Sequence, residues 1–177
     1  MSVFSDFIRV EHLSRTVLSG DNTITILKDV SLKIKQGESV AIQGASGSGK
    51  TTLLTLLAGL DLPTTGEIFF LEHHLNRLSQ EKRTEIRGQY MGFIFQSFQL
   101  LDTLTALQNV MLPLEIHYVE DRKAREEAEK WLTRVGLHER LHHYPKTMSG
   151  GEQQRVAIAR AFVNHPPVIF ADEMTGS

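Results

Sequence analysis

The sequence predicts an α/β fold with a parallel-sheet core, a subdomain of antiparallel strands on its N-terminal side, and an inserted lobe of helices. Three observations support this prediction. A phosphate-loop motif lies between a strand pattern and a helix pattern, helical patterns dominate residues 105–162, and an apolar strand near the end of the chain stops at two carboxylates. The 177 residues suffice for one sizeable core with such a lobe.

The phosphate-loop motif runs from Gly44 to Thr51 and fits the spacing G-x-x-x-x-G-K-[ST]. Residues 38–43 have the pattern of a buried strand, and residues 52–58 have that of a helix with an apolar face. Glycine lets backbone N–H groups approach phosphate oxygens, and the helix N-terminus adds a partial positive charge. Lys50 can reach the β and γ phosphates, and the Thr51 hydroxyl can bind Mg²⁺. The residues expected to bind nucleotide are Gly44, Ala45, Ser46, Gly47, Ser48, Gly49, Lys50, Thr51 and Thr52.

A Gly/Ser-rich surface turn is the alternative interpretation of this motif. The Lys-Thr pair stands in register, and a strand pattern and a helix pattern flank the loop. These features favour phosphate binding over a simple turn.

Strand patterns dominate the N-terminal half of the chain. Residues 7–13 alternate in hydropathy and predict an edge strand, and a polar helix with Ser79 as its N-cap is predicted over residues 79–87. The other predicted strands are residues 23–27 and 30–34, which are interrupted near Lys28-Asp29, and residues 67–71 and 91–95. We expect this antiparallel part to lead into the parallel sheet.

Helical patterns fill the following part. Residues 105–112 are apolar and predict a helix that breaks at Pro113. Residues 122–135 carry an apolar stripe that includes Trp131, which we expect in the core, and Gly136 is expected to end this helix.

An apolar strand over residues 168–171 ends in Asp172 and Glu173. Ligands of parallel sheets bind at the carboxyl ends of the strands, so Asp172 is expected beside the Mg²⁺ held by Thr51. Glu173 is then placed to accept a proton from a water that attacks the γ-phosphate. A strand that ends in a solvated acidic turn is the alternative, and the phosphate loop favours the catalytic interpretation.

A second site suited to phosphate is Ser149-Gly150-Gly151, which opens a long helix that Pro166-Pro167 stops. The two glycines expose backbone N–H groups at the positive end of the helix dipole. Since one γ-phosphate does not need two such sites in one chain, we infer that this one serves the nucleotide of a partner molecule. A simple helix N-cap at Ser149 is the alternative, and both roles can hold together.

With these motifs in this order, the chain resembles the ATP-binding subunit of an ABC transporter, whose fold is a RecA-like P-loop NTPase core. Residues 44–51 match the Walker A motif, Gln96 the Q-loop glutamine, residues 149–153 the signature motif, and residues 168–173 the Walker B motif with its catalytic glutamate. The stretch from Phe93 to Phe98, together with Leu104-Thr105-Ala106 and Asn109-Val110, resembles the lipoprotein-release and macrolide-exporter branch and its YbbA-type members.

The resemblance implies an ATPase that uses ATP and Mg²⁺. It implies catalytic roles for Glu173, Lys50 and Gln96, and metal ligation by Thr51, Gln96 and Asp172. It also implies a head-to-tail dimer with a second copy of the chain, in which each ATP lies between Lys50 of one copy and Ser149, Gly150 and Gly151 of the other.

The resemblance further implies a few-pass membrane permease as partner and a cytoplasmic place on the inner face of the cell membrane. Residues 97–118 would contact the permease, although their apolar side chains could equally belong to the core. The implied organisation is one ABC ATPase domain over residues 1–177. Its parts are residues 1–96 (β subdomain and first part of the core), 97–160 (helical lobe with the signature motif) and 161–177 (return to the core).

Composition excludes several classes of function. Without cysteine there is no disulfide framework, cysteine–zinc site or thiol catalysis. The formal net charge of −2 gives no general attraction to nucleic acid. No stretch approaches the roughly 18 apolar residues that a bilayer span requires. We therefore expect neither a nucleic-acid partner nor direct membrane insertion. A DNA-repair-type ABC ATPase is an alternative that the short interval from Gln96 to Ser149 disfavours.

Three features depart from the family pattern. Val17 stands where an aromatic residue usually stacks on adenine, so weaker adenine selectivity is a hypothesis. Met174 replaces the proline that usually follows the catalytic glutamate and is expected to loosen Glu173. The sequence stops at Ser177, before the D-loop aspartate and the switch histidine. The corresponding hypothesis is a truncated chain that binds nucleotide and hydrolyses it slowly or not at all.

Overall fold

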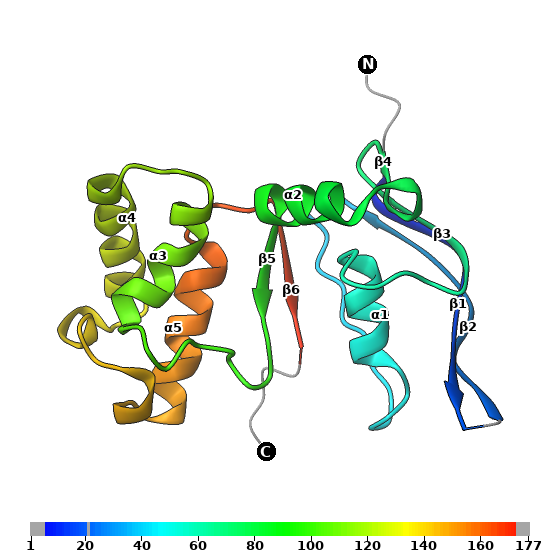
Figure 1. The fold of residues 1–177 in the computed structure, drawn as a ribbon, viewed down its shortest axis with the longest axis horizontal. Coiled ribbons are helices and arrows are strands. Elements are labelled where there is room, and N and C mark those ends of the chain that lie inside the picture. Colours follow the sequence, from blue (N-terminus) through cyan, green and yellow to red (C-terminus); the bar gives the residue numbers. More distant parts are fainter. Residues whose placement is uncertain (1–5, 21, 173–177) are drawn as a thin grey trace. The chain divides into compact units, whose positions relative to one another are not determined.

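The computed structural model describes residues 6–20 and 22–172 (Figure 1). The chain divides into two compact units, Met1–Glu85 and Ile86–Ser177. Each unit buries its own set of apolar side chains.

The first unit is built on a four-stranded antiparallel sheet with the strand order β2-β1-β3-β4. Its strands are β1 (Asp6–Ser19), β2 (Asn22–Lys35), β3 (Thr65–Phe70) and β4 (His73–His74). Because β1 pairs with both β2 and β3, the prediction of an edge strand over residues 7–13 is wrong. Alternation shows only that one face of a strand is buried, as Ile8 and Val10 are, and it does not reveal how many neighbours pair with the strand.

The predicted interruption near Lys28-Asp29 is a bulge within one strand. Asp29 and the facing His12 both have φ 51°, and the register of β1 against β2 shifts on either side. Side chains satisfy the displaced backbone, since Asp29 N–H donates to the Ser14 hydroxyl at 3.0 Å and His12 N–H donates to that of Ser31 at 2.9 Å. Pairing therefore continues across the bulge, and β2 remains a single strand.

Helix α1 (Lys50–Leu57) packs its apolar face inward beside β2 and buries Leu53, Leu56 and Leu57. The prediction of a buried strand over residues 38–43 is wrong. Within the described residues neither sheet includes this segment, and Val40 is 51% exposed. An apolar run becomes a strand only where a neighbour accepts and donates its backbone hydrogen bonds, and the sequence pattern carries no information about that neighbour.

A short 3₁₀ turn, η1 (Leu75–Arg77), and helix α2 (Gln80–Tyr90) carry the chain from the first unit into the second. The Lys82 N–H donates to the Ser79 hydroxyl at 3.3 Å, which confirms Ser79 as the predicted helix cap.

The second unit combines a parallel strand pair with a group of helices. Strand β5 (Met91–Ile94) pairs with β6 (Val168–Ala171), and these two strands lie side by side in Figure 1. The helices between them in sequence are α3 (Ala106–Ile116), α4 (Asp121–Arg134) and α5 (Gly150–Phe162), with the short turns η2 (His138–Arg140) and η3 (Pro145–Thr147). A parallel pair requires such a crossover connection, as the sequence predicts.

Helices α3, α4 and α5 share one apolar core. The predicted stripe of α4 contributes to it, since Ala124, Ala128 and Leu132 are fully buried. Trp131 is half-buried against this core and stacks on Phe162 with ring centroids 5.5 Å apart. Its predicted core role is thus confirmed, although the residue remains partly exposed.

Helix α3 continues through Pro113, so the predicted break is wrong. Pro113 lies in the last turn of the helix, where a missing N–H removes a single intrahelical hydrogen bond. The buried side chains Val110, Met111 and Leu114 hold both sides of that turn against α4 and α5. Their burial offsets the lost bond.

Helix α5 approaches β5 very closely at Gly92. A Cβ atom at Gly92 would lie 2.2 Å from the Ala161 carbonyl oxygen, so only glycine permits this contact.

Among the described residues, none of the helices has the length and apolarity that a bilayer crossing requires.

Candidate nucleotide-binding site

The phosphate loop takes its shape from glycines. Gly47 has φ 76° and Gly49 has φ 91°, both in the left-handed region. At Gly49 a Cβ would also lie 3.0 Å from the Leu27 side chain and 3.1 Å from the carbonyl oxygen of Ile26. Glycine is therefore required twice over at this position, by its backbone conformation and by the close approach to β2.

Helix α1 begins directly after this loop, and its start differs from that of an ordinary capped helix. Gly49 is the N-cap, no side chain caps the helix, and its first turn contains no acidic residue. The first N–H groups of a helix lack partners within the helix, and the helix dipole gives them a partial positive charge. The N-terminus of α1 is thus suited to bind an anion.

Lys50 lies across the loop. Its ammonium donates to the carbonyl oxygens of Gly44 and Ala45, each at 3.0 Å. Thr51 and Thr52 follow in the first turn of α1. The structure therefore places all nine residues predicted to bind phosphate, numbers 44–52, in one loop and one helical turn.

In the second unit, the ends of two parallel strands bring together two further predicted site residues. Ile94 pairs with Ala171, and the N–H of Asp172 donates to the Ile94 carbonyl at 3.0 Å. Gln96 follows β5 by two positions, so Gln96 and Asp172 lie at the same carboxyl edge of the strand pair. Glu173 lies outside the described residues.

Side chains at the start of α5 cap this helix. The Glu152 N–H donates to the Ser149 hydroxyl at 3.3 Å, and the Ser149 N–H donates to the Glu152 carboxylate at 2.8 Å. The Ser149 hydroxyl also donates to the same carboxylate at 2.8 Å. Gly150 and Gly151 occupy the exposed first turn. The capping role of Ser149 is therefore realised by a complete capping box.

These contacts set the charge at the signature motif. The backbone N–H of Ser149 lowers the pKa of the Glu152 carboxyl most strongly, and the Ser149 hydroxyl and Arg140 add to the shift. The Arg140 guanidinium contacts Glu152 at 3.1 Å. Glu152 is thus ionised at neutral pH, and its carboxylate accepts a hydrogen bond from the Ser149 hydroxyl.

Two polar residues to which the sequence analysis assigned no structural role hold the loop after Gln96. Arg160 donates to two backbone carbonyls of that loop, and the fully buried Asn109 donates to three others. Arg160 is the single polar residue of the helical run 156–162, and Asn109 lies beside Gln108 in the otherwise apolar run 106–114. A cation or amide within such a run is a signal that could have identified both.

Comparisons with known proteins agree with this geometry. The sequence pattern of the family described as ABC transporter matches residues 27–176. The uncharacterized ABC transporter ATP-binding protein YbbA of Escherichia coli (strain K12) is 45% identical over 172 residues, which cover 97% of this chain and 75% of YbbA. The lipoprotein-releasing system ATP-binding protein LolD of Idiomarina loihiensis is 46% identical over 170 residues, covering 96% of this chain and 75% of LolD.

A solved structure is similar in fold and in sequence. It is a dimeric post-hydrolysis state of the ATP-binding cassette MJ0796 bound to ADP and Pi, with a TM-score of 0.89 and 43% identity. The match covers 93% of this chain and 73% of the MJ0796 chain. The predicted fold class and branch are both confirmed. The chain therefore belongs to the ABC transporter family, as an ATP-binding subunit of this family of transport ATPases.

Proposed function

We propose that residues 44–52 bind the phosphates of ATP, and that Gln96 and Asp172 serve the Mg²⁺ of the same nucleotide. The observation that carries this proposal is the first turn of α1, which has neither a side-chain cap nor an acidic residue, with the Lys50 ammonium lying over the loop before it. A helix start with these properties favours a polyanion over the solvated turn that was the alternative.

The donor set of the proposed metal site fits Mg²⁺. This ion prefers oxygen ligands, and the chain offers the Thr51 hydroxyl, the Gln96 amide oxygen and the Asp172 carboxylate. The parallel register of β5 and β6 sets Gln96 and Asp172 at one strand edge, which supports their joint assignment. When bound, Mg²⁺ neutralises charge that develops on the transferred phosphoryl group.

The other proposed roles follow from the chemistry of each side chain. The Lys50 ammonium stabilises the β and γ phosphates, and the Glu173 carboxylate accepts a proton from the attacking water. The loop carbonyls of Gly44 and Ala45 hold the Lys50 ammonium near the expected phosphates before binding. This reduces the side-chain freedom that is lost when ATP binds.

Titration of the chain with ATP, with and without Mg²⁺, tests the nucleotide site. Replacing Lys50 by alanine removes charge-assisted hydrogen bonds to phosphate, so we expect affinity to fall about 100-fold. Lys130→Ala on α4, where Lys130 pairs with Glu127, is the matched control and should leave affinity unchanged. Equal affinities for the Lys50 variant and the unmodified chain would refute the proposal.

We further propose that two copies pair head to tail, so that Ser149, Gly150 and Gly151 of one copy contact the ATP of the other. Gly150 lies eleven residues before Ala161, the residue that packs on β5, which amounts to about 16 Å along α5. Because of this distance along α5, Gly150 is better suited to contact the nucleotide of a second copy than a ligand at the β5 and β6 edge of its own chain. Sedimentation with ATP and Mg²⁺ should show a dimer that Glu173→Gln stabilises and Gly150→Asp prevents.

The membrane partner is proposed to be a few-pass permease, with the chain on the inner face of the cell membrane. The lipoprotein-releasing role in the name of LolD supports a membrane partner for this branch. Exposed apolar side chains on the second unit, Leu101, Ile116 and Tyr118, offer a surface for such a contact. Co-purification with the membrane protein encoded beside the gene tests this, and charged substitution of Tyr118 should weaken it.

Weaker adenine selectivity remains a hypothesis. Val17 pairs with Ile24 on β1 and β2, so two aliphatic side chains stand at the position expected for the base. An aliphatic surface contacts any base without the preference that aromatic stacking provides. ATP and GTP affinities within a few-fold of each other would support the hypothesis, and a difference of orders of magnitude would exclude it.

A further inference from the structure

The loop that follows Gln96 has an unfavourable backbone. Phe98 has φ 57° and Gln99 has φ 47°, so two consecutive residues other than glycine occupy the left-handed region. A residue with a side chain is strained in this region and persists there only where the surrounding structure holds it. Local hydrogen bonds exist, since Phe98 N–H donates to Phe95 at 3.0 Å, but a stronger restraint comes from a helix far along the chain.

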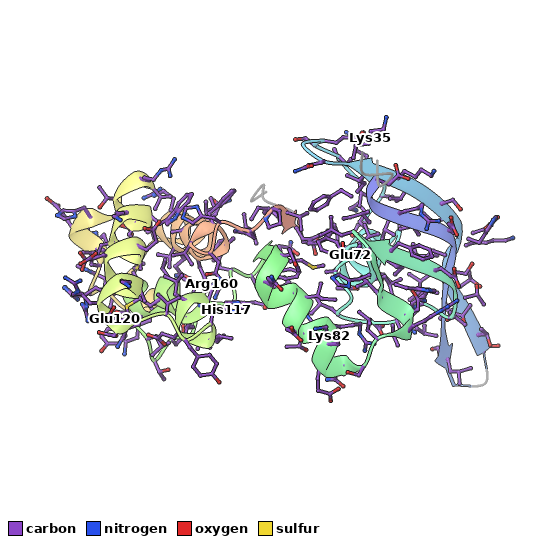
Figure 2. The ribbon with its side chains drawn as sticks, turned by 90° about the horizontal axis from the view of Figure 1, so that it is seen from above. Lys35, Glu72, Lys82, His117, Glu120 and Arg160 are labelled. Atoms are coloured by element: carbon purple, nitrogen blue, oxygen red, sulfur yellow. The ribbon has the colours of Figure 1, made fainter. Side chains whose placement is uncertain are left out.

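That restraint is Arg160, on helix α5 (Figure 2). Its two terminal nitrogens donate to two consecutive carbonyls, Nη2 to Phe98 at 2.7 Å and Nη1 to Gln99 at 2.6 Å. The rigid fork of a guanidinium suits a pair of neighbouring acceptors, which a lysine ammonium cannot match. Burial lowers the pKa of the Arg160 guanidinium, yet an arginine remains charged at neutral pH.

A second side chain fixes the remainder of the same loop. The Asn109 amide nitrogen donates to the carbonyls of Leu101, Leu104 and Thr105 at 3.0 to 3.1 Å, and its oxygen accepts the Leu101 N–H at 2.8 Å. Asn109 belongs to α3 and is fully buried. The loop between Gln96 and α3 is therefore held by two helices, and its first turn, next to Gln96, is held by α5.

We propose that Arg160 is a positioning residue for Gln96, which links the orientation of the signature helix to the metal-binding edge of β5 and β6. Gln96 precedes the clamped turn by two residues, so a displacement of α5 moves the backbone that carries its side chain. The same helix begins at Ser149, the residue proposed to meet a partner's nucleotide. The inference rests on the proposed role of Gln96 at Mg²⁺.

A purely structural role for Arg160 makes a different prediction. It would lower the free energy of unfolding and would leave the effect of Mg²⁺ on nucleotide binding unchanged in the folded fraction. The deciding quantity is therefore the ratio of ATP affinities with Mg²⁺ and with EDTA, measured on folded protein. Phosphate-loop binding without metal serves as an internal reference, since the Arg160 guanidinium donates to carbonyls of Phe98 and Gln99, in the loop after Gln96.

The experiment compares Arg160→Lys, Gln96→Ala, the double variant, and Arg125→Lys as a control at an exposed position of α4. We expect Arg160→Lys and Gln96→Ala each to reduce the Mg²⁺-dependent gain in affinity about 10-fold, as the loss of one metal contact does. The double variant should lose no more than either single variant, because both act on one ligand. Affinity in EDTA and the behaviour of Arg125→Lys should stay within about 2-fold of the unmodified chain.

The outcomes separate the two proposals. If Gln96→Ala loses the Mg²⁺ gain and Arg160→Lys keeps it, the positioning role is overturned while the nucleotide site stands. If Gln96→Ala itself has no effect, the metal assignment of Gln96 fails, and the positioning role fails with it. If the losses add in the double variant, the two residues act independently, and the inference is again overturned.

A second variant covers the case in which Arg160→Lys unfolds. Gln99→Gly keeps the carbonyl that Arg160 contacts and adopts a left-handed φ without a steric penalty. In the Arg160→Lys background, Gln99→Gly should restore folding and recover part of the Mg²⁺ gain, because a glycine keeps the left-handed backbone of the turn without the restraint from Arg160. Restored folding together with the full Mg²⁺ gain of the unmodified chain would show that Arg160 has a purely structural role.

Discussion

Helices α1 and α5 both begin at residues suited to phosphate, yet their first turns are completed in opposite ways. The N-cap of α1 is Gly49, with a left-handed backbone, no side-chain cap and no acidic residue in the first turn. The N-cap of α5 is Ser149, which forms a capping box with the ionised Glu152. The third residue of the helix differs correspondingly, Thr52 in α1 and Glu152 in α5.

The difference indicates what each site requires. At α1 neither a side-chain cap nor an acidic residue of the first turn competes with an anion for the backbone N–H groups, and the Lys50 ammonium rests on neutral carbonyl oxygens. At α5 an anion must compete with the Glu152 carboxylate for the Ser149 hydroxyl. We infer that α1 supplies the primary affinity for nucleotide and that α5 binds only when a second copy brings the phosphate into place.

The largest expected effect concerns the backbone that shapes the start of α1. Gly49→Ala forces a Cβ against Leu27 and the Ile26 carbonyl at φ 91°, so the free energy of unfolding should fall by about 2–3 kcal/mol. Gly47→Ala is the matched control, with φ 76° and open space around the added Cβ, and should cost only about 1 kcal/mol. Urea unfolding followed by circular dichroism measures both, and equal losses would show that the contact with β2 is unimportant.

Making α1 resemble α5 tests the comparison directly. Thr52→Glu places a carboxylate at the helix position that Glu152 occupies in α5, so ATP affinity should fall about 10- to 30-fold by charge repulsion. Folding stability should not decrease, because an acidic residue in the first turn favours a helix. Thr52→Gln has the same size without charge, and an equally large loss of affinity for this variant would rule out the electrostatic explanation.

Removing the cap of α5 should have a moderate effect. Ser149→Ala removes the acceptor of the Glu152 N–H and should lower the free energy of unfolding by about 1 kcal/mol. Ser46→Ala is the comparison in the phosphate loop, where the N-cap of α1 is Gly49, and should change stability by less than about 0.3 kcal/mol. Thermal unfolding of both variants measures these changes. A comparable loss of stability in Ser46→Ala would remove the distinction between the two helix starts.

The smallest effect is a dependence of stability on pH. Because the pKa of Glu152 is lowered in the folded chain, its contribution is fully present above the ordinary glutamic acid value and is lost as pH falls through the folded value. Unfolding free energies at about pH 7 and pH 3 should therefore differ more for the unmodified chain than for Glu152→Gln. Identical pH dependence of the two proteins would mean that the capping carboxylate gains nothing from its charge.

Features that depend on neighbouring residues in sequence were predictable. The phosphate loop, the cap at Ser79, and the strand ends that carry Gln96 and Asp172 follow from spacings of a few residues. The glycine that ends α4, Gly136, has φ 75° as expected of such a stop. A helix cap or a glycine turn is decided within one turn of chain, so the local sequence contains the necessary information.

Features that depend on distant partners were decided only by the tertiary structure. The central position of β1, the lack of strand pairing over residues 38–43 and the tolerance of Pro113 in α3 all depend on what packs beside each segment. Arg160 meets its two carbonyls across 61 and 62 positions of sequence. The order of the motifs thus determined the family and the chemistry. Strand pairing and side-chain burial determined how those motifs are positioned, because both depend on contacts between segments that are remote in sequence.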